Sequence, residues 1–225
     1  MKTIVMMLLL LVPMFQVSAE DTSYEAGVHY LEIANPIETN LENGQSGEVL
    51  VFFKYTCPAC YQLHPYIESW ESTLDDGVVV RRIPVFQPDI YSKAFYAADL
   101  FNLDDAFHEA VYQQIHLRRQ PLRSLEEFAQ LASGYGGDEA RFISTANSFV
   151  VDMKVNQGNK IAAQARVPGT PYMVVNGKYL LSGRMAGSNE GMLKVADYLL
   201  SKEKSERTFI GNQGSPIFSR TLADK

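Results

Sequence analysis

The chain is poor in cysteine: Cys57 and Cys60 are the only two among its 225 residues. Two cysteines are too few for the disulfide framework of a small secreted scaffold. They are also too few for a zinc site, which usually needs four ligands, because the histidines at 29, 64, 108 and 116 show no ligand spacing. A static disulfide across two intervening residues would close a very small loop and add little stability. Redox chemistry is therefore favoured over an inert disulfide or a metal site.

Long hydrophobic runs are also lacking. The apolar stretch at residues 4–15 is the longest in the sequence, and about 12 residues are too few to span a bilayer. Lys2 precedes this stretch and the small residues at 17–19 follow it, which is the pattern of a secretory signal peptide. We expect residues 1–19 to be a cleaved signal peptide. The mature chain would then be exported to an oxidising compartment, where disulfides persist.

Positive charge is not in excess. The sequence has 20 Lys and Arg against 26 Asp and Glu, for a formal net charge of −6. This balance argues against a nucleic-acid-binding surface. Hydrophobic residues make up 46% of the chain, which is enough for a sizeable core in one domain with an insertion.

The cysteine pair lies where a predicted strand gives way to a predicted helix. Residues 49–53 are an apolar run typical of a buried strand, and an apolar helical period begins right after Cys60. Cys57 therefore falls at a helix N-terminus, where free backbone N–H groups and the helix dipole favour an anion. A thiolate is such an anion, so we expect a depressed pKa for Cys57. Pro58 suits the first helical turn, and Cys60, one turn further on, should be the shielded partner of an exposed nucleophilic sulfur.

The N-terminal part of the chain predicts alternating strands and a helix. We expect strands at 28–33, 49–55 and 78–85, and a helix after Cys60 to about residue 74. Pro65 lies inside this helical pattern and predicts a kink or a short first segment. A strand, a helix and a second strand at this spacing indicate a parallel pair with a right-handed crossover.

The middle of the chain predicts helices alone. Residues 88–165 show successive helical apolar periods and no strand signal. A glycine-rich loop at 134–137 precedes Asp138, a plausible N-cap. We interpret this stretch as a helical domain inserted into an α/β core.

Strands return after residue 166. A turn-rich loop at 167–171 leads into two apolar runs separated by Asn176-Gly177, the strongest hairpin signal in the sequence. Ser188 or Asn189 is expected to cap a last helix over about 192–202. Residues 205–225 are expected to be a polar, loosely ordered tail.

With these elements in place, the chain resembles the DsbA family of exported thiol–disulfide oxidoreductases. The similarity covers about residues 24–203, and three segments carry it: 49–62, 148–163 and 167–179. It implies a periplasmic α/β protein with a thioredoxin fold and an inserted helical domain. The implied boundaries are 20–87 and 166–204 for the thioredoxin-like domain and 88–165 for the helical one.

The resemblance also implies site residues and partners. Cys57 and Cys60 would form the redox-active disulfide, supported by Pro58 and Ala59. Pro171 matches the family's cis-proline beside the dithiol, and the Thr170 backbone would pair with an extended substrate segment. The substrates would be reduced or unfolded exported proteins, and a DsbB-type membrane oxidase would reoxidise the pair. No cofactor or metal is implied. No segment between residues 20 and 45 looks dedicated to dimerisation, so a monomer is expected.

Three positions depart from the family pattern. Ala59 replaces a histidine, Val51 replaces a buried acid that serves as a proton acceptor, and Thr170 replaces a valine. Loss of the histidine should raise the pKa of the Cys57 thiol and weaken the disulfide as an oxidant. Lys54 would partly offset this if its side chain approached the sulfur; a solvent-facing Lys54 is the alternative.

Three functions therefore stay open on the sequence. The pair could oxidise exported proteins. It could instead work in the reducing or isomerising direction, which Ala59 and Thr170 favour. The third possibility is a non-catalytic, chaperone-like peptide-binding module, against which the intact Cys-x-x-Cys argues.

Overall fold

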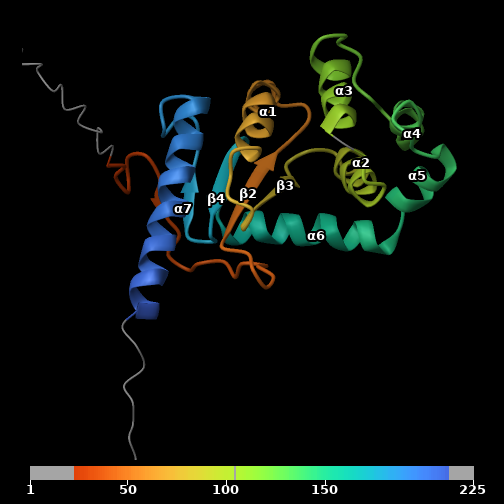
Figure 1. Ribbon diagram of the computed structural model, residues 1–225. Helices are drawn as coiled ribbons and strands as arrows, with labels where there is room; N and C mark the ends of the chain where they lie inside the picture. The colour runs from red at the N-terminus through yellow and green to blue at the C-terminus, as the bar shows by residue number, and fades with distance from the viewer. Residues whose placement is uncertain (1–22, 104, 213–225) are drawn as a thin grey trace, which may run out of the picture.

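The computed structural model describes residues 23–103 and 105–212. The predicted signal peptide at 1–19 lies outside the described residues. A five-stranded sheet with helices on both faces forms one part of the molecule, and a group of helices forms the other (Figure 1). In this described part, no helix is both long enough and apolar enough to cross a membrane.

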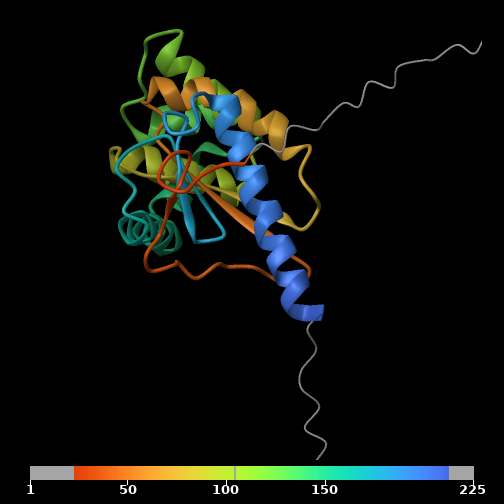
Figure 2. The same cartoon turned by 90° about the vertical axis from the view of Figure 1, so that its left-hand side faces the viewer.

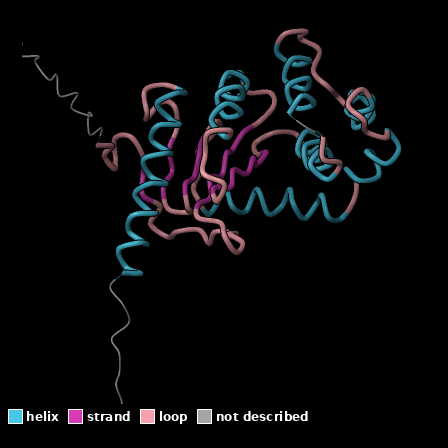
Figure 3. The backbone as a smooth tube through the Cα atoms, in the orientation of Figure 1, coloured by secondary structure: helices cyan, strands magenta, loops and turns pink. Residues whose placement is uncertain are grey.

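The sheet is mixed and has strand order β1-β5-β4-β2-β3. Figure 3 shows its strands in magenta, with helices in cyan around them. Strand β2 (Gly47–Phe53) is an interior strand and is fully buried, as its apolar run predicts. It pairs in parallel with β3 (Val78–Pro84), which confirms the predicted strand–helix–strand unit. On its other side β2 pairs antiparallel with β4 (Tyr172–Val175), which continues through a hairpin into β5 (Tyr179–Leu181). The short β1 (Leu31–Glu32) closes the far edge.

One face of the sheet is covered by α1 (Pro58–Glu71) and α7 (Asn189–Asn212), the latter in front of the sheet in Figure 2. Alternate residues of β2, Val51 among them, pack on this face, as the two-residue period of a strand requires. The indole N–H of Trp70 donates a hydrogen bond of 2.7 Å to Asp197 Oδ1 and ties the two helices together.

The other face is covered by the C-terminal half of α6 (Phe149–Gln164). Leu50 and Phe52, the intervening residues of β2, pack there against Ala162 and Ala165. The first half of α6 extends away from the sheet into the helical part (Figure 1). This helix therefore belongs to both parts and joins them.

Four more helices complete the helical part: α2 (Asp89–Leu100), α3 (Asp105–His116), α4 (Leu125–Ser133) and α5 (Glu139–Ala146). Phe107, Phe128 and Phe142 are completely buried at its centre. The prediction of helices alone between residues 88 and 165 is confirmed. The same apolar cluster continues to Cys57 and Cys60, so the dithiol lies where the two parts meet.

The helix starts follow the side-chain capping rule. In each of four helices an N-cap oxygen accepts a hydrogen bond from a backbone N–H three residues on; the caps are Ser124, Asp138, Ser148 and Ser188. Asp138 is the predicted cap of α5. Of the two candidates for α7, Ser188 is the cap and Asn189 is the first helical residue.

The last helix is longer than predicted. It begins at Asn189 and runs to Asn212, through residues 205–212 that we assigned to a loose tail; residues 213–225 lie outside the described part. The sequence beyond residue 202 lacks an apolar period but is rich in Lys and Glu, which favour helix. Buried Glu203 also anchors this stretch, because it accepts hydrogen bonds from Lys178 Nζ at 2.6 Å and Tyr179 Oη at 2.8 Å.

Two N-terminal elements also differ from expectation. Helix α1 is continuous through Pro65 and ends at Glu71, so the predicted short first segment is wrong. Proline costs the helix one hydrogen bond, and the packing of α1 on the sheet outweighs that loss. The expected strand at 28–33 is reduced to Leu31–Glu32. Residues 27–29 form a turn instead, and Tyr30 makes an isolated bridge with Ala26.

The Asn176-Gly177 hairpin forms as predicted, with φ of 48° at Asn176 and 67° at Gly177. Positive φ at both central residues is the requirement of a type I′ turn. The carbonyl of Gly177 accepts a hydrogen bond of 2.8 Å from the Ile37 N–H. A Cβ atom on Gly177 would overlap the backbone carbonyl of Ile37.

Gly177→Ala is therefore expected to lower the free energy of unfolding by about 2–3 kcal/mol, from positive-φ strain and displacement of the Ile37 backbone. Gly44→Ala is the matched control, since Gly44 has φ of 93° but open space around its Cα; it should cost only about 1 kcal/mol. Urea denaturation measures both. Equal losses would show that the Ile37 contact does not matter.

Candidate active site

The cysteine pair sits on the loop that joins β2 to α1. The Cys57 N–H donates to the Lys54 carbonyl at 3.1 Å, which turns the chain from the strand into the helix. Cys57 is the N-cap residue of α1, with an extended backbone, and Pro58 occupies the first helical position. The predicted placement of Cys57 at a helix N-terminus is confirmed.

The environment of Cys57 stabilises its thiolate. The pKa of Cys57 is lowered to about 5, chiefly by the hydrogen bond that the Cys60 thiol donates to it. Burial acts in the opposite direction, while the backbone N–H groups of Cys60 and Ala59 and the Thr170 side chain lower the pKa further. The Cys60 N–H lies 3.4 Å from Cys57 Sγ. The expected pKa depression thus comes from specific donors at the helix start.

Cys60 is the shielded partner. Its side chain is 3% exposed, and its pKa is raised by the hydrogen bond to Cys57 and by burial. Cys57 is itself only 7% exposed, so the contrast in accessibility is smaller than predicted. What separates the two sulfurs is the preferred protonation state: thiolate at Cys57 and thiol at Cys60.

The loop before β4 lies against this pair. The Thr170–Pro171 peptide bond is cis, as the family resemblance implies. Cys57 Sγ is 3.5 Å from the Thr170 carbonyl oxygen, which accepts a hydrogen bond from the sulfur when Cys57 is protonated. The structure therefore brings together Cys57, Cys60, Thr170 and Pro171, which are far apart in the sequence.

The predicted supporting residues surround the pair in different ways. Pro58 and Ala59 are exposed beside Cys57. Lys54 is half-buried at the end of β2 and contributes through its backbone. The Lys54 side chain is not among the causes of the low Cys57 pKa, so backbone donors and Cys60, rather than a cation, account for it.

Comparison with known proteins gives consistent matches. The family model described as "DSBA-like thioredoxin domain" matches residues 90–197. The thiol:disulfide interchange protein DsbA of Pseudomonas aeruginosa is 34% identical over 203 residues, which is 88% of this chain and 94% of that protein. DsbA of Azotobacter vinelandii is 33% identical over 193 residues, covering 84% and 88%. This chain belongs to the DsbA family.

Solved DsbA structures agree with this assignment. The crystal structure of P. aeruginosa DsbA superposes with a TM-score of 0.77 at 34% identity, over 82% of this chain and 97% of that one. DsbA from Xylella fastidiosa gives a TM-score of 0.73 at 28% identity, over 81% and 98%. The predicted fold class, a thioredoxin fold with an inserted helical domain, is confirmed. The protein is a thiol:disulfide oxidoreductase with its cysteine pair in Cys-x-x-Cys spacing.

An aromatic and histidine cluster, which the sequence did not reveal, supports the dithiol loop of this DsbA-family chain. The hydroxyl of buried Tyr55 pairs with His108 Nδ1. His116 Nε2 bonds the Tyr55 carbonyl at 2.7 Å and stacks on Tyr61 with ring centroids 5.1 Å apart. His108, Tyr112 and His116 recur every four residues, so they share one face of α3. This four-residue spacing is the feature of the sequence that indicates a shared helix face, although it does not match the spacing of metal ligands.

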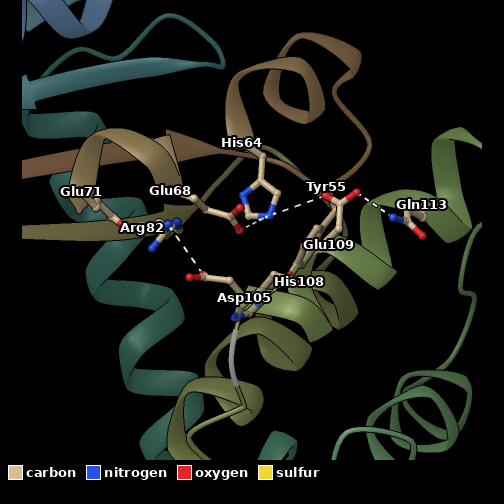
Figure 4. A network of polar contacts seen from close by, with 9 residues as sticks. All are labelled: Tyr55, His64, Glu68, Glu71, Arg82, Asp105, His108, Glu109 and Gln113. Carbon is tan, nitrogen blue, oxygen red and sulfur yellow. Dashed lines mark hydrogen bonds and ion pairs between the residues drawn. The ribbon is translucent and has the colours of Figure 1, made fainter. Parts of the chain in front are cut away.

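A network of charged side chains links α1, β3 and α3 (Figure 4). Arg82 Nη2 lies 2.8 Å from Glu71 Oε2 and 3.7 Å from Asp105 Oδ1. His64 Nε2 lies 3.0 Å from Glu68 Oε1 and 3.8 Å from Glu109 Oε2. These contacts join the active-site helix to the helical part of the molecule.

Burial shapes the titration of this network. The pKa of His64 is lowered, first by burial and then by the Arg82 charge, against the opposing effect of Glu109. The pKa of Glu71 is raised by burial, although Arg82 counteracts this. His64 is therefore mainly a neutral imidazole near pH 7.

Other kinds of site find no support in the described part of the chain. Residues 23–103 and 105–212 contain no group of three or more His, Cys, Asp or Glu side chains placed to hold a metal ion. A cavity of about 820 Å³ lies between β3 and helices α2 and α6, but neither cysteine lines it. The active site is therefore identified by the two thiols and their hydrogen-bond donors, and not by the size of a cavity.

In the reduced protein, alkylation of Cys57 by iodoacetamide should follow a single titration with a midpoint near pH 5. The rate rises with pH because the thiolate is the nucleophile, and it should be close to its plateau by pH 7. Mass spectrometry of the alkylated site, with Cys57→Ser as control, separates it from Cys60, which should stay unmodified. A midpoint near that of an ordinary thiol, about 8.5, would contradict the assigned donors.

Proposed function

We propose that the protein introduces disulfide bonds into exported proteins, with Cys57–Cys60 as the disulfide donor. The observation that carries this proposal is the stabilised Cys57 thiolate beside a Cys60 held as a thiol. A dithiol whose reduced form is stabilised gives up its disulfide readily, because reduction of that disulfide is favoured. This favours the oxidising direction in spite of Ala59.

The reaction has two exchange steps. A substrate thiolate attacks Cys57 Sγ, the Cys57–Cys60 bond breaks, and its electron pair passes to Cys60, which is protonated. A second substrate thiolate then attacks the substrate sulfur of the mixed disulfide, and Cys57 leaves as a thiolate. The substrate is oxidised to a disulfide and the enzyme is reduced to the dithiol. The low pKa of Cys57 makes it a good leaving group in the second step.

Substrate would bind beside Cys57 at the loop that precedes β4. Within the described part of the chain the Thr170 N–H makes no hydrogen bond, and the Thr170 carbonyl oxygen lies 3.5 Å from Cys57 Sγ. An extended peptide could therefore pair with the Thr170 backbone as an added strand. Pro58, Ala59 and Pro171 would line the entry, and Lys54 would support the loop from behind.

The proposal extends to location, organisation and partners. Lys2 and the apolar stretch at 4–15 support cleavage of a signal peptide at 1–19 and export to the periplasm. Residues 20–87 and 166–204 would act as the thioredoxin-like domain and 88–165 as the helical domain. A DsbB-type membrane oxidase would reoxidise a monomeric enzyme whose substrates are reduced or unfolded exported proteins.

A disulfide reductase or isomerase is the second candidate, since Ala59 and Thr170 depart from the oxidase archetype. In that direction Cys57 would attack a substrate disulfide and Cys60 would resolve the intermediate. The two candidates share one pair of sulfurs and differ in which redox state the enzyme brings to the substrate.

The test is oxidative refolding of a reduced, unfolded two-cysteine protein by the oxidised enzyme without another oxidant. The oxidised wild type should convert about one substrate disulfide per molecule, and Cys57→Ser should convert none. Cys60→Ser, activated as a Cys57 mixed disulfide with glutathione, should accumulate an enzyme–substrate conjugate. Binding of the reduced protein without disulfide transfer would instead identify a chaperone-like module, and transfer only from reduced enzyme to an oxidised substrate would identify a reductase.

A further inference from the structure

The thiol–disulfide exchange established above requires Cys60 to gain or lose a proton in every cycle, in either direction. Its side chain is 3% exposed, so bulk water does not reach it freely. A buried thiol therefore needs a group nearby that can hold its proton, because an unpaired charge in such an environment is costly.

The structure places one such group next to Cys60. Cys60 and His64 lie four residues apart on α1, where side chains are neighbours on one helix face. Both line a cavity of about 20 Å³, together with Val51 and Pro171. A cavity of this size holds about one water molecule, which is enough to connect a sulfur to an imidazole by hydrogen bonds.

Among the described residues, one ring nitrogen of buried His64 lacks a hydrogen bond and has only carboxylates nearby. The residue is 4% exposed, and its Nε2 makes no hydrogen bond within the described part of the chain. Its nearest polar contact is Glu68 Oε1 at 3.0 Å, an ion-pair contact when the imidazole is protonated. Buried polar nitrogens are rarely left without a hydrogen bond, so this nitrogen is free to accept or donate a proton during the reaction.

The face of α1 that carries Cys60 and His64 continues to a residue that solvent reaches. Glu68 follows His64 by four residues, and its side chain is 33% exposed. Glu109, held by a 2.8 Å hydrogen bond from Gln113, approaches His64 from α3 and is 34% exposed. Cys60, His64 and Glu68 thus follow one another at four-residue intervals along α1, from the buried thiol to the surface. Figure 4 shows His64 beside Glu68 and Glu109.

No other side chain of the cavity can take the proton at neutral pH. Val51 is apolar, Arg82 is a permanent cation, and Tyr112 is a buried phenol whose pKa is raised by burial. We propose that His64 relays the Cys60 proton between the buried cavity and the Glu68–Glu109 surface. His64 does not touch the reacting sulfurs: it holds the proton that Cys60 releases and receives it through one water molecule.

When a partner is linked to Cys57 by a mixed disulfide, the Cys60 thiol passes its proton through the water to neutral His64. The Cys60 thiolate attacks Cys57 Sγ, a Cys57–Cys60 bond forms, and the partner sulfur leaves with the electron pair of the broken bond. In the opposite direction the imidazolium returns the proton as Cys60 leaves.

The pKa of His64 is lowered first by burial and then by Arg82 on β3, and it is raised by Glu109 and Asp105 on α3. Two further titratable groups face the imidazole: Glu68 on α1, at 3.0 Å, and Tyr112 on α3, with ring centroids 5.0 Å apart. Burial and Arg82 favour the neutral imidazole, and the carboxylates favour the cation. The neutral form dominates above the lowered pKa of His64, so the relay should accept protons at neutral pH and fail as pH falls below that value.

The test is stopped-flow reaction of the reduced protein with 5,5′-dithiobis(2-nitrobenzoic acid). The first equivalent of thionitrobenzoate reports attack by Cys57, and the second reports attack by Cys60. In His64→Leu, the second phase should slow at least about tenfold at pH 7, in line with the usual contribution of general acid–base catalysis. The first phase should stay within about twofold of wild type.

His29→Gln is the matched control, because His29 lies outside α1 and outside the cavity; both phases should be unchanged. A second phase within about twofold of wild type in His64→Leu would overturn the relay, and so would equal slowing of both phases, which would mean a structural role. Loss of the first phase in wild type would instead refute the exchange chemistry itself.

A second measurement does not depend on the variant folding. In wild type, the rate of the second phase plotted against pH should inflect at the His64 pKa determined by NMR. An inflection elsewhere, or none between pH 4 and 8, would overturn the proposal.

Discussion

The hydrogen bonds that converge on the Cys57 sulfur are the interaction on which the site depends. They come from the Cys60 thiol and from N–H groups at the start of α1, and they exist only because the chain turns from β2 into a helix at that residue. The same bonds hold Cys60 as a thiol. One local feature, a cysteine at an N-cap position, therefore separates the two sulfurs into a thiolate that exchanges and a thiol that resolves.

The surrounding structure keeps this feature in place. β2 is buried on both faces, and the loop that follows it is held by Tyr55 and the histidines of α3. The charged network around Arg82 and His64 joins α1 to β3 and α3. Because these contacts span both parts of the molecule, the helical part does more than cover the dithiol: it positions the strand–helix junction that carries it.

Much of this was predictable because it follows local rules. The apolar run of β2, the Asn176-Gly177 turn, the Asp138 cap and the position of Cys57 at a helix start all depend on a few neighbouring residues. The extent of α7 was not predictable in that way, because its last turns are polar and buried Glu203 is recognised only by partners 25 and 24 residues away. The role of His64 depends on contacts with β3 and α3 that only the tertiary fold creates. For the same reason, the Cys60 thiol could be identified as the main donor to Cys57 only once the loop was placed.

The most direct test of this account is the reduction potential of the Cys57–Cys60 pair, measured by equilibration with glutathione buffers and quantified by trapping free thiols in acid. Stabilisation of the Cys57 thiolate predicts a potential well on the oxidising side of about −200 mV, the region of an oxidising compartment. A value near that of thioredoxin, about −270 mV, would show that the disulfide is the preferred state. It would contradict the claim that the reduced form is stabilised by the helix start and by Cys60.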